Sequence, residues 1–295
     1  DGEETVEQSF TVTVENTNDA PEFLSEEIIT ATEDVIYSYP VSAEDVDAGD
    51  ALAITASTIP AWLTLVDNEN ETGLLEGTPE NGDVGDHAVV LRVTDGSGDF
   101  DIQSFIITVE NTNDAPVFTS EAIPTAVEDA EYSYTMVAED VDEGDELTYT
   151  APSLPDWLTF DDSNTISGTP LNADVGDHAV VLSVTDGEET VEQSFTVTVE
   201  NTNDAPEFLS DAITEATEDI LYSYSIISSD VDAGDSLVIT ASTILPGWLE
   251  LVDNGDSTGT LKGTPENGDV GDHAVVLRVT DGSGDFDIQS FIITV

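Results

Sequence analysis

The sequence predicts an all-β protein of tandem antiparallel β-sandwiches joined in an elongated array. Three observations predict this fold class. Apolar and polar residues alternate within short segments, which is the period of a strand with one buried face. Gly and Asp turns interrupt these segments roughly every 8–12 residues, and no stretch shows a convincing helical period. The same markers also recur along the chain of 295 residues, which indicates about three copies of one unit.

The alternation is clearest in a segment that contains Tyr-Ser-Tyr. Tyr37, Tyr39 and Val41 share one face of this predicted strand, and the segments 10–14 and 89–93 alternate in the same way. Six or seven such strands fit into a unit of about 92 residues, which is typical of a β-sandwich. We therefore expect the tyrosines of this segment in the core.

The repeat boundaries are marked by the hexapeptide Asn-Thr-Asn-Asp-Ala-Pro, which begins at Asn16, Asn111 and Asn201. Proline donates no ladder hydrogen bond and keeps the preceding residue extended, so we expect a linker at each hexapeptide. The chain then divides into residues 1–18, which are the last strand of a preceding repeat with its linker, and three full repeats. These are residues 19–113 (repeat 1), 114–203 (repeat 2) and 204–295 (repeat 3).

The lone strand predicted for residues 6–14 cannot remain unpaired, because a strand needs a partner for its backbone hydrogen bonds. Two explanations stay open. The strand belongs to a sandwich of a longer continuous chain, or it completes a sandwich in a neighbouring molecule of a fibre or filament.

Two long segments recur without change. Glu80–Val109 has the same sequence as Glu266–Val295, and residues 1–25 match residues 186–210. The larger unit is therefore a pair of domains about 185 residues long. A catalytic site usually occurs once in a chain, so near-identical copies favour a structural protein over an enzyme.

The charge of the chain restricts its partners. The sequence has 65 Asp and Glu against 3 Lys and Arg, a net charge of −62, and no Cys. Such a chain repels nucleic acid and anionic membranes and attracts cations. The lack of Cys excludes disulfides, zinc–thiolate sites and a cysteine nucleophile. No apolar segment is long enough to insert into a membrane, and no recognisable hydrolytic triad surrounds the three histidines.

Several carboxylates fall at turns that one end of a sandwich would bring together. Asp45 and Asp47 project from the same side of an extended stretch, and Asp95 ends a strand at a Gly turn. Clustered carboxylates repel one another unless a hard cation lies between them, and Ca²⁺ binds 6–8 oxygens of this kind. The segment is not an EF-hand loop, because Asp50 and Ala56 occupy the positions of its Gly and bidentate Glu.

The order of these motifs resembles that of a known family. Glu33-Asp34, Asp45-x-Asp47, Thr-Asp-Gly and Asn-Asp-x-Pro follow one another as in cadherin-type repeats. The added motifs Pro-x-Trp-Leu, Gly-Thr-Pro and Asp-Val-Gly are similar to those of dystroglycan-type cadherin-like and "putative Ig" repeats of bacterial surface adhesins. The resemblance covers essentially the whole chain, recurs in all three copies, and implies Ig-like/cadherin-like sandwiches with Ca²⁺ at the junctions between repeats.

The resemblance also implies a set of metal ligands from the upstream repeat, the linker and the downstream repeat. The linkers here carry fewer carboxylates than those of cadherins, so fewer ions or different ligands are expected. The implied ligands are Asn16, Asn18, Asp19, Asp45, Asp47 and Asp95 at the first junction; Glu33, Asp83, Asn111, Asn113, Asp114, Asp140, Asp142 and Asp186 at the second; and Glu128, Asp174, Asn201, Asn203, Asp204, Asp230, Asp232 and Asp281 at the third.

The function implied is structural and adhesive. We expect a non-enzymatic segment of an extracellular bacterial surface protein or fibre, stiffened by Ca²⁺, with neighbouring repeats, other cell-surface proteins or glycans as partners. An alternative is a carbohydrate-binding accessory module of a secreted polysaccharide-active protein. That alternative requires aromatic side chains exposed in a groove, whereas the phase of Trp62, Trp157 and Trp248 predicts that they are in the core.

Overall fold

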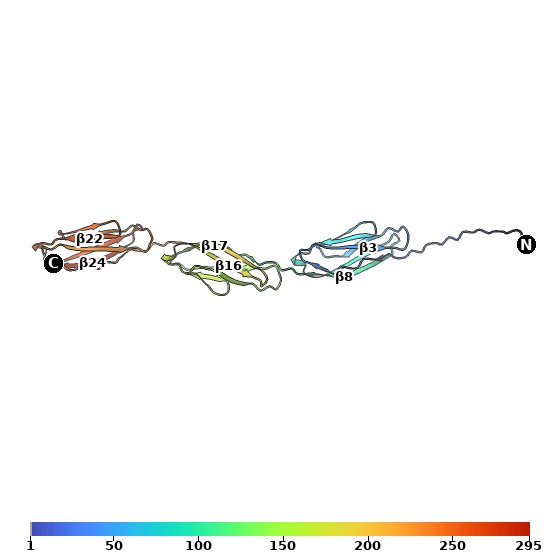
Figure 1. Cartoon of the computed structure of the whole chain (residues 1–295), viewed down its shortest axis with the longest axis horizontal. Helices are drawn as coiled ribbons and strands as arrows, with labels where there is room; N and C mark the ends of the chain where they lie inside the picture. The colour runs from blue at the N-terminus through green and yellow to red at the C-terminus, as the bar shows by residue number, and fades with distance from the viewer. Residues whose placement is uncertain (1) are drawn as a thin grey trace. The chain divides into compact units, whose positions relative to one another are not determined.

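The computed structural model describes residues 2–295 and is all-β (Figure 1). The contacts divide the chain into two compact units. The first contains the residues up to Pro116 together with Glu139–Leu147 and Asp186–Glu189. The second contains Val117–Ala138, Thr148–Thr185 and Thr190–Val295. Two loops of repeat 2 therefore group with repeat 1 and its linker, so each junction described below lies inside one unit.

Repeat 1 is a sandwich of two four-stranded sheets in the first unit. One sheet has the order β1-β3-β6-β5 and the other the order β2-β8-β7-β4. β2 pairs with β8 in parallel, and the other pairs are antiparallel. The elements are β1 (Glu22–Phe23), β2 (Thr30–Thr32), β3 (Tyr37–Glu44), β4 (Ala53–Thr58), β5 (Leu63–Asp67), β6 (Thr72–Gly77), the 3-10 turn η1 (Asn81–Asp83), β7 (Gly85–Thr94) and β8 (Phe100–Glu110).

The second unit holds the sandwiches of repeats 2 and 3, with two differences in their elements. The counterpart of β3 is divided into two strands in repeat 2, and the counterpart of β2 in repeat 3 is an isolated bridge between Glu215 and Thr294. Repeat 2 has β9 (Val117–Phe118), β10 (Thr125–Val127), β11 (Tyr132–Thr135), β12 (Ala138–Glu139), β13 (Thr148–Ser153), β14 (Thr159–Phe160), β15 (Thr165–Gly168), η2 (Asn172–Asp174), β16 (Gly176–Thr185) and β17 (Thr190–Glu200). Repeat 3 has β18 (Glu207–Phe208), β19 (Tyr222–Ser229), β20 (Val238–Ala241), β21 (Leu249–Asp253), β22 (Thr258–Gly263), η3 (Asn267–Asp269), β23 (Asp272–Thr280) and β24 (Phe286–Thr294).

The core of each sandwich comes from the alternation along its strands. On β3, Tyr37, Tyr39 and Val41 are buried between exposed neighbours. The hydroxyl of Tyr39 donates to Oε1 of Gln103 on β8 at 2.8 Å, so its polar end is satisfied inside the core. Trp62 packs edge-on against Tyr37, with ring centroids 5.8 Å apart. The tyrosines and this tryptophan thus belong to the core region.

The Gly-Thr-Pro motif begins at Gly77, the last residue of β6, where close packing requires a glycine. A Cβ atom built on Gly77 would overlap the carbonyl oxygen of Trp62, and Gly168 and Gly263 face Trp157 and Trp248 in the same way. The backbone of the Pro-x-Trp-Leu turn therefore lies directly against the end of this strand. The Gly-Thr-Pro and Pro-x-Trp-Leu motifs therefore contact each other in the fold.

Residues 6–14 form no strand among the described residues, and Val6, Phe10, Val12 and Val14 are largely exposed. The identical sequence in repeat 2 lies within β17, where it pairs with β16. The partner strand thus decides whether this sequence joins a sheet. Within residues 2–295, no helix has the length and apolar character needed to cross a membrane.

Candidate metal sites at the repeat junctions

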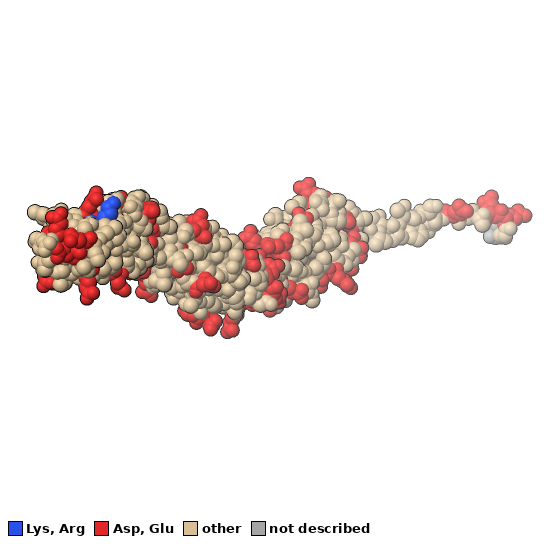
Figure 2. Space-filling model, turned by 60° about the vertical axis from the view of Figure 1, so that its left-hand side comes forward, with Lys and Arg blue, Asp and Glu red and all other residues tan. Residues whose placement is uncertain are grey.

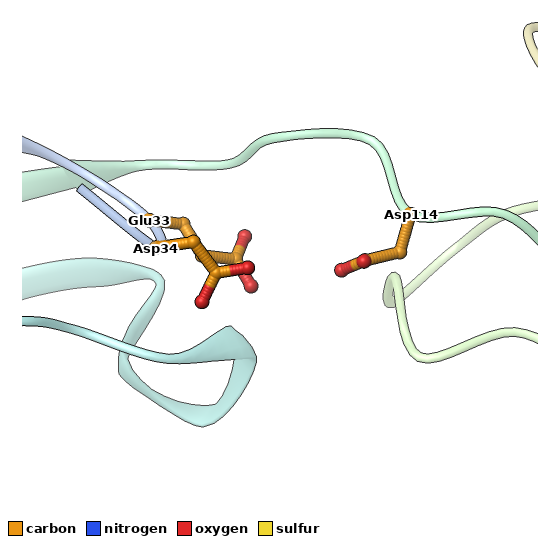
Figure 3. Close-up of side chains that lie close together, drawn as sticks. All are labelled: Glu33, Asp34 and Asp114. Carbon is orange, nitrogen blue, oxygen red and sulfur yellow. The ribbon is translucent and has the colours of Figure 1, made fainter.

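The second junction joins repeat 1 to its following linker through three carboxylates. Glu33 and Asp34 follow β2, and Asp114 lies in the linker; one oxygen from each falls within 4.8 Å of the others. Figure 3 shows the carboxylates of Glu33 and Asp34 directed toward Asp114. Asp34 has a positive φ of 57°, an uncommon conformation that Asp tolerates better than most residues. The chain reversal after β2 thereby places two successive carboxylates at the same end of the sandwich.

Glu33 is the most deeply buried of these groups, with 1% of its surface exposed. Its Oε2 accepts a hydrogen bond from the backbone N–H of Thr112 at 3.2 Å. Its Oε1 is buried and has no partner. Glu218, the equivalent residue of repeat 3, is only half-buried. The linker after β8 therefore covers Glu33 and leaves one of its oxygens unsatisfied.

The loops of repeat 2 that group with the first unit supply a second cluster. Asp140, Asp142 and Asp145 each place one oxygen within 4.8 Å of the others. The backbone N–H of Asp142 donates to Oδ1 of Asp140 at 3.0 Å, which fixes the turn. The backbone N–H of Asp114 in turn donates to Oδ2 of Asp142 at 2.7 Å. The linker residue Asp114 thus contacts both clusters, through its side chain and its backbone.

Asp186, which directly follows β16, lies at the same junction. Its Oδ1 accepts the backbone N–H groups of Glu188 and Glu189, both at 2.7 Å. Its Oδ2 accepts Nδ2 of Asn113 at 3.0 Å. Asn113 lies in the linker, so this bond joins the linker to a loop of repeat 2. Rotation of the amide about its last side-chain bond would present its oxygen, instead of its nitrogen, to a cation.

The third junction repeats this arrangement inside the second unit. Glu128, Asp204 and Asp232 form one cluster, and Asp230, Asp235 and Asp281 form another. The backbone N–H of Asp204 donates to Asp232 at 2.7 Å, as Asp114 does to Asp142. Glu128 is 2% exposed, and its Oε1 is also buried without a partner. Asn203 bonds to Asp281 at 2.9 Å.

The first junction contains the linker and downstream groups. Asp45, Asp47 and Asp50 form the cluster. Asn16 donates to Asp47 at 2.7 Å, and Asn18 donates to Asp95 at 2.9 Å. The backbone N–H of Asp19 bonds to Asp47 at 2.7 Å. The same linker geometry therefore occurs at all three hexapeptides.

The donor set fits a hard divalent cation. Such a cation would compensate carboxylate oxygens that are buried without a hydrogen-bond partner. Oε1 of Glu33, Oδ2 of Asp140 and Oδ1 of Asp142 are buried and unpartnered at the second junction. Buried carboxylates without compensation are destabilising, by several kcal/mol in general. Oxygen ligands from Glu, Asp and Asn are those that Ca²⁺ prefers, so these residues fit the ion.

The third aspartate of each Asp-x-Asp-x-x-Asp turn has a raised pKa. Burial, followed by repulsion from Asp140, Asp142 and Asp186, raises the pKa of Asp145 above its usual range. The pKa values of Asp50 and Asp235 rise for the same reasons.

Hydrogen bonds lower the pKa of the aspartate that follows the long strand of each repeat. Asp95 and Asp281 have lowered pKa values chiefly because Asn18 and Asn203 donate to them. The pKa of Asp186 is lowered chiefly by the backbone N–H of Glu189.

Four of the expected residues neither belong to these clusters nor take part in the linker hydrogen bonds described above. Oδ2 of Asp83 accepts the backbone N–H of Glu80 at 3.1 Å and stabilises η1, and Asp174 does the same for Leu171 in η2. Asn111 and Asn201 are exposed, and Asn201 lines a surface pocket together with Asp232 and Asp235.

Sequence reasoning missed other members of the sites. Nδ2 of Asn81 in η1, two residues before Asp83, donates to Asp114 at 2.7 Å, and Asn172 donates to Asp204 at 2.7 Å. Asp34 belongs to the first cluster of the second junction, and the downstream clusters include the last Asp of each Asp-Val-Asp-x-Gly-Asp motif. The repetition of that motif could have identified Asp50, Asp145 and Asp235 as candidate ligands. No local signal identifies Asn81, because its partner lies 33 residues away.

The three repeats match one known protein family. The family described as "Putative Ig domain" matches residues 20–110, 115–200 and 205–295. The chain belongs to this family. The Ig repeats account for nearly the whole sequence, which confirms the resemblance drawn from the motifs.

Relatives of known name are adhesins. The chain is 29% identical over 137 residues to the "Serine-rich adhesin for platelets" of Staphylococcus aureus strain USA300, a match that covers 46% of this chain and 6% of the adhesin. The protein of the same name from strain MRSA252 is 30% identical over 133 residues, covering 45% and 9%. The matched region thus spans less than a tenth of these relatives.

Solved structures show the same fold. Protocadherin gamma B2 extracellular cadherin domains 1–5 match with a TM-score of 0.57 at 18% identity, covering 94% of this chain and 60% of that one. Protocadherin gamma B7 domains 1–4 match with a TM-score of 0.54 at 17% identity, covering 94% and 76%. The Ig repeats therefore have a cadherin-like fold.

Proposed function

We propose that this chain is a structural, adhesive segment of an extracellular bacterial surface protein or fibre, in which Ca²⁺ fixes each repeat to the next. The observation that supports this most is the buried, unpartnered Oε1 of Glu33, repeated at Glu128. Each lies where one repeat meets the following linker. Burying a carboxylate oxygen without a partner costs folding free energy, and a bound cation would offset that cost at both junctions.

The ligands proposed at the second junction come from three parts of the chain. Glu33 and Asp34 belong to repeat 1, Asp114 and Asn113 to the linker, and the aspartates around Asp142 to the loops of repeat 2. A bound Ca²⁺ supplies the positive charge that cancels their repulsion and adds oxygen coordination across the junction. Asp114 connects repeat 1 with the loop of repeat 2, because its carboxylate faces Glu33 and its N–H donates a hydrogen bond to Asp142.

The extracellular and adhesive part of the proposal rests on the relatives and on the surface. The named relatives are adhesins. Figure 2 shows acidic side chains scattered over the visible face of the molecule, consistent with the net charge of −62. A non-enzymatic role also follows most simply from three copies of one site. The three tryptophans pack against core tyrosines, which argues against their use as a sugar-binding platform.

Calorimetric titration of the chelated chain with CaCl₂ tests this proposal. We expect saturable binding, and we expect Glu33→Gln to remove or weaken the ions of the second junction. Glu218→Gln is the matched control, because Glu218 is chemically the same but is not covered by a linker here. Absence of Ca²⁺ binding at physiological salt, or equal losses in both variants, would overturn the proposal.

A further inference from the structure

The outer faces of repeats 1 and 3 differ from the rest of this acidic surface. On β7 and β8 the outward positions between Asp86 and Glu110 carry no carboxylate, although the chain has 65 Asp and Glu residues. They carry Phe100, Ile102 and Ile106, which are about half exposed (47%, 50% and 54%). We use "outer face" for these outward positions of β7 and β8 and for the equivalent ones of β23 and β24.

The same outer face recurs in repeat 3 but not in repeat 2. Phe286, Ile288 and Ile292 of repeat 3 are 47%, 47% and 53% exposed. The equivalent positions of β17 hold Thr190, Glu192 and Thr196, so the apolar stripe is absent there. Repeat 2 has the same sandwich without the stripe, so the fold itself does not require these exposed apolar residues.

Each outer face also holds an arginine. The guanidinium of Arg92 lies 4.0 Å from the centroid of the Phe100 ring, and Arg278 lies 3.8 Å from that of Phe286. Nε of both arginines is buried without a hydrogen-bond partner. Ser183 occupies this position in repeat 2. Two of the three cationic side chains of the protein thus lie on apolar sheet faces, over an aromatic ring.

The charges along β7 are self-complementary. Its outward row runs Asp86, Ala88, Val90, Arg92, with a negative charge at one end and a positive charge at the other. A second copy placed face to face, related by a two-fold axis that crosses the strands near Val89, would set Arg92 of each copy opposite Asp86 of the other. Val89 pairs with Phe105, so the same operation lays the outward row of β8 over that of the other copy, with Ile106 opposite Ser104 and Ile102 opposite Thr108.

We propose that the outer faces of repeats 1 and 3 are docking surfaces for a second copy of this chain. A chain of charge −62 approaches another most easily where carboxylates are few, and on the outward rows of β7 and β8 they stand only at the ends, at Asp86 and Glu110. Each chain carries two such faces, so it can contact another copy through either of them. A glycan that stacks on an aromatic ring is disfavoured, because the guanidinium already covers one face of Phe100.

Sedimentation velocity of the full chain in CaCl₂, at about 0.15 M salt to screen long-range repulsion, tests this proposal. The test variant carries Arg92→Ser, Phe100→Thr, Ile102→Glu and Ile106→Thr, with the four equivalent changes in repeat 3. Each new residue is the one that repeat 2 already has, so the sandwiches should tolerate it. We expect the wild type to dimerise reversibly and the variant to dimerise at least roughly tenfold more weakly. The control Ser194→Glu with Thr196→Glu changes the charge of repeat 2 by two negative charges, as the test variant does in each of repeats 1 and 3, and should leave dimerisation unchanged.

A charge exchange tests the two-fold geometry. Arg92→Asp with Arg278→Asp should weaken association, and adding Asp86→Arg with Asp272→Arg should restore it. A wild type that remains monomeric at every concentration would overturn the proposal. It would also fail if the test variant dimerised as well as the wild type, which would assign association to another surface, such as the exposed segment around Phe10. These readouts do not depend on whether Glu33 binds calcium, so the two proposals can fail separately.

Discussion

The backbone N–H of Asp114 donates a 2.7 Å hydrogen bond to Oδ2 of Asp142. This bond joins the linker after repeat 1 to the first acidic loop of repeat 2. The side chain of Asp114 meanwhile faces Glu33 and Asp34. One linker residue therefore sets the distance between two carboxylate clusters. The same relationship recurs between Asp204 and Asp232, at the same distance.

Substitution of Glu33 should have opposite effects with and without calcium. In chelator, Glu33→Gln removes a buried charge, so we expect repeat 1 to become more stable or to stay unchanged. In calcium, the variant loses a ligand, so we expect a loss of about 1–3 kcal/mol relative to the wild type. Thermal and urea unfolding in both conditions measures this, with Glu218→Gln as the control. The same sign of change in both conditions would contradict the account.

The raised pKa of Asp145 predicts how pH affects the calcium-free protein. A carboxyl whose pKa is raised by folding stabilises the fold below its unfolded pKa, and this contribution is lost as the pH rises through the folded pKa. Asp145→Asn should therefore increase stability in chelator at neutral pH, with little effect at pH values below about 3.

Asp161 provides the opposite control for Asp145. Backbone N–H groups of Thr165 and Ser163 lower its pKa, so its contribution is present above its unfolded pKa and is lost as the pH falls through the folded value. Asp161→Asn should thus destabilise the protein at neutral pH. Urea unfolding between acidic and neutral pH compares the two variants. If both variants changed the stability in the same direction at neutral pH, the environment of Asp145 would not be unfavourable to its charge.

Gly77 should be intolerant of substitution. An added Cβ would overlap the carbonyl oxygen of Trp62, so Gly77→Ala must displace the backbone of the Pro-x-Trp-Leu turn. We expect a loss of about 1–3 kcal/mol. Gly82→Ala is the control, since nothing lies within 4 Å of a Cβ there. Chemical denaturation monitored by tryptophan fluorescence measures both, and similar stabilities would show that the turn is adaptable.

Much of the fold follows from local sequence. The alternation around Tyr37 and Tyr39 predicts β3, because burial of every second side chain is a property of the strand itself. The hexapeptides mark the linkers because proline interrupts a ladder. Residues 6–14 show the limit of such reasoning, since the same sequence is a strand only where β16 pairs with it.

The sites were predictable where ligands are close in sequence, and less so elsewhere. Asp140 and Asp142 lie on one turn, so their spacing alone brings them together. Asp83 was expected beside the linker, but its carboxylate accepts the N–H of Glu80 in the 3-10 turn. Asn81 contacts Asp114 instead. Which residue of a short turn points outward depends on its hydrogen bonds, which sequence spacing does not reveal.

Small-angle X-ray scattering of the full chain with CaCl₂ and then with chelator tests the central claim most directly. If calcium holds the junctions, chelation should make the particle flexible and reduce its maximum dimension, while circular dichroism shows that the β-structure is kept. Glu33→Gln with Glu128→Gln should resemble the chelated wild type even in calcium. A scattering curve that does not change on chelation would contradict the account, because packing alone would then hold the repeats together.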